Sequence, residues 1–308
     1  MLMGPRGLAI GFAPMVCRAI LVPMHEEPFI VHGGAGVATT LVLDSPHSGT
    51  VMPPDFGSVL PPLALREGED CFIDELYLPA TARGVPLLAA LFPRTYLDAN
   101  RHAGDVDLDL MDAPWPHEYR PSGKAAIGKA LVWRTLDDGR PLYDRRLGVA
   151  EVKARIEGCH RPYHAALRAL LDAAHARFGV VHHINCHSMN AVSGLMGEGG
   201  AGIARADIVL GDRDGTTCAS EFTFFVRDFL AACGYGVKVN DPFKGVELVR
   251  AYADPAAGRH SLQLEVNKRL YLQDGTLRKS AGFAHLQSHL MALVDAIVER
   301  FTPRARHV

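Results

Sequence analysis

Two histidines and a glutamate, His47, His187 and Glu265, lie where predicted strands end, and together they could hold a metal ion and use it. The strands expected to carry these residues are 39–44, 180–186 and 262–266. In an open α/β sheet, ligands bind at the carboxyl ends of the strands, so we expect these side chains to meet there. Two histidines and one carboxylate, with a fourth position left open, commonly hold a hydrolytic zinc ion.

The spacing of residues does not identify the third metal ligand. The chain contains neither an H-x-x-E nor an H-E-x-x-H motif. Asp70 and Asp74 both lie in the first turns of a helix predicted over 70–83, and either could be the ligand. The residues alone leave this choice open.

Glu265 lies in the segment QLEVN, where residues alternate between the two faces of a strand. The alternation places Gln263, Glu265 and Asn267 on one face. A carboxylate within a sheet is costly unless it is paired or takes part in chemistry. One interpretation is a salt bridge to Arg250 or Lys268. The other is a general base that takes a proton from a water molecule activated by a metal.

Three arginines lie in compact polar motifs: Arg101 in DANRH, Arg161 in HRPYH and Arg250 in GVELVRAY. Arginine recognises carboxylates with two parallel hydrogen bonds, so several arginines in one site predict an anionic substrate. For each of them the alternative is a solvated surface side chain.

Strand patterns alternate with helix patterns along the chain, which predicts an α/β fold with a parallel or mixed sheet. No repeat or linker interrupts residues 27–308, so we expect one domain preceded by a poorly ordered extension over 1–26. A helix starting near Val149 should be kinked or split by Pro162. Residues 112–145 are rich in proline, glycine and charge, and irregular segments of this length are usually functional loops or lids.

Composition excludes several classes of protein. The 308 residues carry a formal net charge of −2, which leaves no basic excess for nucleic-acid binding. No apolar run reaches the 18 or so residues of a membrane span. The six cysteines form no C-x-x-C pair, which argues against disulfides or a thiolate zinc site and favours the cytoplasm. Cys186 precedes His187 directly, so the two should point to opposite faces, and Cys186 is expected in the core.

From about Phe29 onward the sequence resembles the N-formylglutamate amidohydrolase family. The motifs that carry the resemblance are, in order, LVLDSPHSGTVMPPDF, DANR, HRPYHAAL, INCHSMN, LGDRDGTTC, DPFKGVELVRAY and GRHSLQLEVNKRLY. The resemblance implies a twisted mixed sheet with helices on both faces, similar to zinc carboxypeptidases and aspartoacylases. It also implies the metal ligands His47, Asp70 and His187, in preference to Asp74, and Glu265 as the catalytic base.

The same resemblance implies the activity, a zinc-dependent hydrolysis of N-formyl-L-glutamate to formate and L-glutamate, the last step of one histidine-degradation route. One zinc per chain is expected, although cobalt, iron or manganese could occupy the same ligands. The substrate would be a small anionic N-acyl amino acid, bound by the residues Asn100, Arg101, Arg161, Arg250 and His260. The alternatives are a deacylase or carboxypeptidase-like peptidase for another N-acyl amino acid, and a non-catalytic anion-binding protein.

Overall fold

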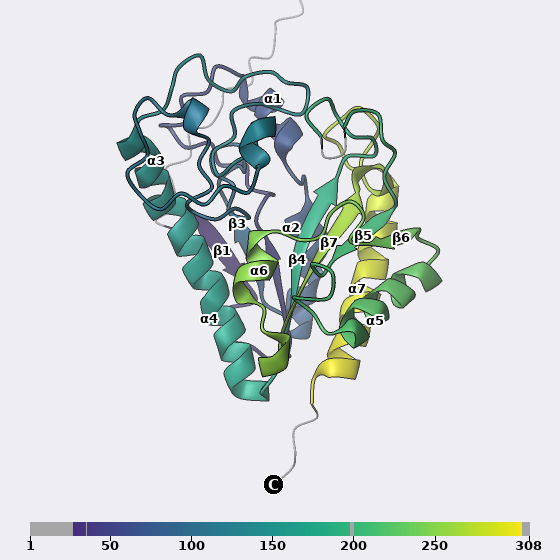
Figure 1. The fold of residues 1–308 in the computed structure, drawn as a ribbon. Helices are drawn as coiled ribbons and strands as arrows, with labels where there is room; N and C mark the ends of the chain where they lie inside the picture. Colours follow the sequence, from purple (N-terminus) through teal and green to yellow (C-terminus); the bar gives the residue numbers. More distant parts are fainter. Residues whose placement is uncertain (1–26, 35, 198–199, 304–308) are drawn as a thin grey trace, which may run out of the picture.

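The computed structural model describes residues 27–34, 36–197 and 200–303, and the predicted extension over 1–26 lies outside them. A mixed seven-stranded sheet occupies the centre of this part of the chain, in the order β1-β3-β2-β4-β7-β5-β6 (Figure 1). The strands are β1 (Phe29–His32), β2 (Leu41–Ser45), β3 (Leu87–Ala90), β4 (Val181–Met189), β5 (Ile208–Gly211), β6 (Val237–Val239) and β7 (Arg259–Asn267). The central strands β3, β2, β4 and β7 are parallel, whereas β1 and β5 run antiparallel to their neighbours β3 and β7.

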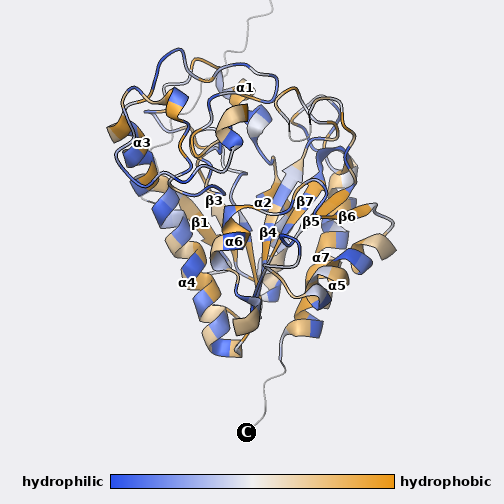
Figure 2. Ribbon diagram, viewed as in Figure 1, coloured by the Kyte–Doolittle hydropathy of each residue, from blue (hydrophilic) through white to orange (hydrophobic). Residues whose placement is uncertain are grey.

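Helices cover both faces of the sheet, which confirms the predicted α/β class (Figure 1). They are α1 (Pro62–Leu65), α2 (Ile73–Tyr77), α3 (Val149–Arg155), α4 (Arg161–Phe178), α5 (Ser220–Ala232), α6 (Glu247–Tyr252) and α7 (Gly282–Phe301). One hydrophobic core joins Val42 of β2 to Leu167 of α4, and a second joins Leu43 of β2 to Leu290 of α7. Figure 2 shows α4 and α7 banded with hydrophilic and hydrophobic residues, as expected for helices with one buried face.

The long helix expected from Val149 is split, as predicted. Helix α3 passes through a π-helical turn, Ile156–His160, into α4. Pro162 has no N–H to donate to the preceding helical turn, and it lies directly after the π-helical turn, where the regular hydrogen-bond pattern is already interrupted. Gly179 ends α4 in the left-handed conformation, with φ 74°.

The helix expected over 70–83 is shorter than predicted. Phe72 has φ 61°, and α2 begins after it, so Asp70 precedes the helix instead of lying on it. The chain continues from Leu78 to Arg83 as a 3₁₀ helix. Pro79 at the start of that segment cannot donate the hydrogen bond that would continue α2.

Several short elements were not predicted from the sequence. Strands β1 and β6 are edge strands of four and three residues, and their residues are partly exposed. Helix α6 has only six residues. No helix in the part of the chain that the structure describes is long and apolar enough to cross a membrane.

Candidate metal centre and substrate cavity

The pairing of β4 with β7 brings two of the predicted residues together. His187 and Glu265 are direct partners across these parallel strands, as are Asn185 and Gln263. All four alternate with residues such as Cys186 that enter the core on the other face of the sheet. The expected position of Cys186 is therefore confirmed.

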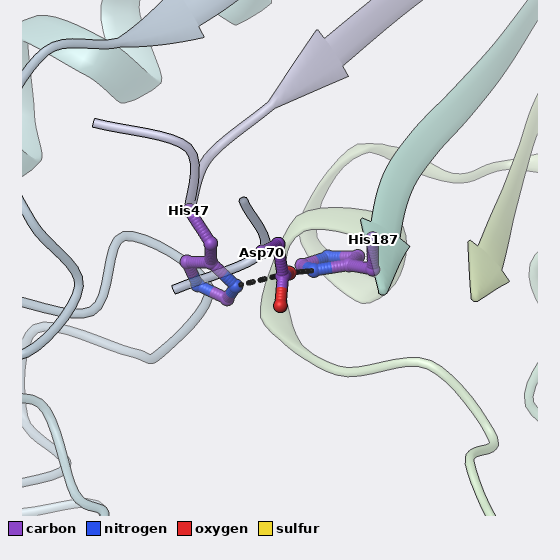
Figure 3. Close-up of side chains that lie close together, drawn as sticks. All are labelled: His47, Asp70 and His187. Carbon is purple, nitrogen blue, oxygen red and sulfur yellow. Dashed lines mark hydrogen bonds and ion pairs between the residues drawn. The ribbon is translucent and has the colours of Figure 1, made fainter. Parts of the chain in front are cut away.

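His47, Asp70 and His187 form a buried cluster at this edge (Figure 3). His47 follows the end of β2, and its Nδ1 lies 3.2 Å from Asp70 Oδ2. His187 Nδ1 lies 2.9 Å from the same oxygen. The three candidate ligand atoms lie within 4.8 Å of one another. Of the two aspartates left open by spacing, Asp70 lies in this cluster, whereas Asp74 lies on α2.

The outer nitrogen of each imidazole has an acceptor, so both rings turn Nδ1 toward Asp70. His47 Nε2 lies 2.7 Å from Asp98 Oδ1, and His187 Nε2 lies 2.6 Å from Asn185 Oδ1. Burial opposes ionisation of Asp98, but the charges of His47, Arg101 and Arg94 outweigh it and hold the pKa of Asp98 well below its usual range. Asp98 is therefore an acceptor, and His47 Nε2 donates to it.

Asp70 also remains ionised. Burial opposes its ionisation, but its contacts with His187 and His47 and the charge of Arg94 lower its pKa well below the usual range. Burial lowers the pKa of His187, which favours the neutral imidazole. With Nε2 on Asn185 Oδ1, the neutral ring of His187 turns the lone pair of Nδ1 toward Asp70 Oδ2. His47 Nδ1 faces the same oxygen. Two nitrogens and one oxygen are a donor set that suits zinc.

A cavity of about 600 Å³ opens over this cluster. Its wall contains ten lysines or arginines and six aspartates or glutamates, an excess of positive charge that suits an anionic ligand. The predicted residues Asn100, Arg101, Arg250 and Glu265 all line it. The irregular segment 112–145 contributes Arg120 and seven further residues to the wall, and its closure as a lid stays a prediction.

Glu265 lies beside the cluster of His47, Asp70 and His187, with its side chain largely buried. Glu265 is 8% exposed. Gln263 Nε2 donates a hydrogen bond of 2.9 Å to Glu265 Oε1. Arg250, one of the two partners considered from sequence, pairs instead with Glu247 at 2.6 Å. This position, next to the cluster and in the cavity wall, is suitable for a general base.

The structure does not bring His260 or Arg161 to the cavity. His260 is five residues before Glu265 on β7, about 16 Å along an extended strand. Arg161 points to solvent with 66% of its side chain exposed, and it pairs with Glu157 one turn earlier in the helical segment. Neither residue lines the cavity, so we propose no contact of either with the substrate.

The HRPYH motif contacts the site through its histidines. His160 Nε2 lies 2.8 Å from the carbonyl oxygen of Arg101, and His164 Nε2 lies 2.8 Å from that of Ala99. Both imidazoles donate to the backbone of the DANR segment, which carries Asn100. The motif therefore holds that segment in place, whereas Arg161 lies outside the contact.

Sequence reasoning missed Asp98 and Arg94. Asp98 is the first residue of the DANR motif, and a carboxylate beginning a polar motif could have been considered as a partner for a metal-binding histidine. Arg94 pairs with Asp98 at 3.1 Å and with Asp70 at 3.5 Å, and it lines the cavity. Nothing in the spacing of Arg94 identified it, because its neighbours in the chain follow no regular pattern.

Comparison with known proteins gives consistent matches. A model of the N-formylglutamate amidohydrolase family matches residues 39–272. An N-formylglutamate deformylase of Pseudomonas putida is 30% identical over 215 residues, 67% of this chain and 71% of the relative. Another, from Pseudomonas aeruginosa, is 30% identical over 239 residues, 76% of this chain and 82% of the relative.

Two solved structures are also similar. The crystal structure of an N-formylglutamate amidohydrolase from Ralstonia eutropha JMP134 is 44% identical, with a TM-score of 0.82 over 88% of this chain and 97% of that chain. A gene product of Agrobacterium tumefaciens has a TM-score of 0.64 over 89% of this chain and 95% of its own. Its 16% identity shows similarity of fold alone.

Proposed function

The chain belongs to the N-formylglutamate amidohydrolase family, and from this we propose that it hydrolyses N-formyl-L-glutamate to formate and L-glutamate with one zinc ion per chain. The observation that carries the proposal is the convergence of His47 Nδ1, His187 Nδ1 and Asp70 Oδ2 beside Glu265. The place in histidine degradation, the cytoplasmic setting and the likeness to zinc carboxypeptidases and aspartoacylases belong to the same proposal. Five described cysteines are free, which suits a reducing compartment.

His47, Asp70 and His187 would hold the zinc ion. When bound, zinc supplies a Lewis acid that polarises a carbonyl oxygen and increases the acidity of water. Cobalt, iron or manganese could use the same donor set. The residues behind the ligands orient them: Asp98 accepts from His47 and Asn185 accepts from His187.

Glu265 moves the proton in the proposed reaction. Its carboxylate accepts a proton from the attacking water as the oxygen bonds to the formyl carbon, and it delivers that proton to the amide nitrogen as the C–N bond breaks. Gln263 Nε2 donates to Oε1 of this carboxylate and orients it in the cavity wall. The products are formate and the free amine of L-glutamate.

The cations of the cavity would bind the two carboxylates of the substrate. Arg250 is the candidate whose side chain remains partly exposed, at 35%, while Arg101 is buried and donates to the carbonyl oxygens of Lys129 and Asn100. Arg250 can therefore contact substrate directly. Arg101 forms part of the cavity wall. Asn100 Nδ2 lies 3.0 Å from His187 Nε2.

We expect Arg250→Ala to raise KM roughly 10- to 100-fold with little change in kcat, because a hydrogen bond to a charged group contributes about 1.5–3 kcal/mol. Steady-state kinetics with N-formyl-L-glutamate would measure this. Arg161→Ala is the matched control and should leave both constants unchanged, since its side chain faces solvent. A rise in KM for Arg161→Ala alone would contradict the assignment of Arg250.

A panel of N-formyl-, N-acetyl- and N-succinyl-L-glutamate tests the acyl group. We expect the highest kcat/KM for the formyl compound, by at least about 10-fold over acetyl, which adds one methyl group. A preference for acetyl or succinyl would support the alternative of a deacylase for another N-acyl amino acid. Hydrolysis of none of them, nor of a peptide, by zinc-loaded protein would favour the non-catalytic anion-binding protein.

A further inference from the structure

A group of fully buried polar side chains lies behind His187 on the central strands β2, β4 and β7. Asp44, Asn185, His183 and Ser261 are each at most 1% exposed. Buried polar groups destabilise a fold unless they are hydrogen-bonded. Here His183 lies 2.7 Å from Ser261 Oγ and 2.8 Å from Asp44 Oδ1, so the group is internally bonded.

Asp44 accepts hydrogen bonds from three directions. Asn185 Nδ2 donates to Oδ1 at 2.7 Å, His183 Nε2 contacts the same oxygen, and Tyr163 donates its hydroxyl to Oδ2 at 2.7 Å. Burial opposes ionisation of Asp44, but its contacts with His183, Asn185 and Tyr163 outweigh it and lower its pKa. An ionised carboxylate can only accept, so Asp44 holds the amide nitrogen of Asn185 toward itself.

The orientation of Asn185 decides which nitrogen of His187 carries the proton. With its nitrogen on Asp44, Asn185 presents Oδ1 to His187 Nε2 at 2.6 Å. An amide oxygen accepts, so Nε2 carries the hydrogen and Nδ1 keeps its lone pair toward Asp70.

Asn100 does not reverse this assignment. Its own Oδ1 accepts from the backbone N–H of Leu248 at 2.9 Å, which turns Nδ2 toward His187 Nε2 at 3.0 Å and Asn185 Oδ1 at 3.3 Å. The opposite tautomer would place the Nε2 lone pair 2.6 Å from the oxygen of Asn185, which is repulsive. Nδ2 of Asn100 therefore donates to Asn185 Oδ1.

We propose that Asp44 and Asn185 are positioning residues that keep His187 in the tautomer and orientation that bind the metal. The inference rests on the proposed zinc site. The two metal-binding histidines are then held by carboxylates in different ways: Asp98 contacts His47 directly, whereas Asp44 acts on His187 through the amide of Asn185.

The test is the zinc affinity of the metal-stripped full-length protein, measured by competition with a chromophoric chelator. Asp44→Asn keeps the shape of the side chain but lets the Asn185 amide turn over, and we expect zinc affinity to fall roughly 10- to 100-fold. Tyr163→Phe removes a hydrogen bond from the other oxygen of Asp44 and should keep wild-type affinity within about threefold. Thermal unfolding of each apoprotein is the control that checks whether both variants are folded.

If Asp44→Asn does not fold, Asn185→Ala gives the same test, since it removes the acceptor of His187 and leaves Asp44 with two donors. A wild-type protein that binds zinc, together with an equally tight Asp44→Asn or Asn185→Ala variant, would overturn the positioning role alone. A similar loss of affinity in Tyr163→Phe would also overturn it, because the effect would then follow from any damage to the buried group. A wild-type protein that does not bind zinc would overturn the metal site and this inference together.

Discussion

Glu265→Gln should lower kcat for N-formyl-L-glutamate at least about 100-fold while the protein still binds one zinc ion per chain. General base catalysis contributes roughly 10²–10⁴-fold, and an amide cannot accept the proton of the attacking water. The substitution keeps the volume of the side chain and its contact with Gln263, since an amide oxygen also accepts a hydrogen bond. Steady-state kinetics and metal analysis on the same sample measure both expectations.

Glu67→Gln is a matched control for this change. Glu67 also lines the cavity, but 53% of its side chain is exposed and it pairs with Arg140. Its kcat should stay within about twofold of wild type, as is usual for exposed ion pairs. Unchanged turnover in Glu265→Gln would remove Glu265 as the base. Loss of zinc from that variant would instead assign Glu265 to the metal.

Asp70→Asn should abolish both zinc binding and turnover. It replaces the carboxylate whose Oδ2 faces both His47 and His187 with a neutral amide of the same shape. Losing the hydrogen-bond partner behind a ligand costs about 10- to 100-fold in metal affinity, so weakening the ligand itself should cost more. Chelator competition and formate release would be measured together.

Asp74→Asn is the corresponding control, because Asp74 lies on α2 outside the cluster. It should keep its zinc and most of its activity. The reverse pattern, with Asp74→Asn losing metal and Asp70→Asn retaining it, would show that the aspartate four residues later is the ligand.

The sequence was informative where side chains lie on regular strands. Period-two alternation and the meeting of strand ends predict that His187 and Glu265 share one edge of the sheet, and β4 and β7 place them as direct partners. The same reasoning could not choose Asp70. Its position follows from the left-handed conformation of Phe72, which delays the start of α2, and an apolar pattern carries no sign of such a conformation.

Residues in loops and helix ends were harder to predict. Asp98 and Arg94 reach the cluster from an irregular segment, where no periodicity relates sequence position to direction. In HRPYH, the arginine is the residue type that most suggests anion binding. The helix, however, turns His160 and His164 inward and Arg161 outward. Residue type alone could not predict which side chains of α4 point toward the site, because α4 follows a π-helical segment.

Formate release from N-formyl-L-glutamate, measured on purified protein before and after chelation and again after zinc is restored, tests the central claim most directly. The donor set of His47, Asp70 and His187 predicts that release stops when zinc is removed and returns when zinc is added. Full release from protein whose zinc content has fallen to zero would contradict the metal mechanism, and no release from protein carrying one zinc per chain would contradict the proposed substrate.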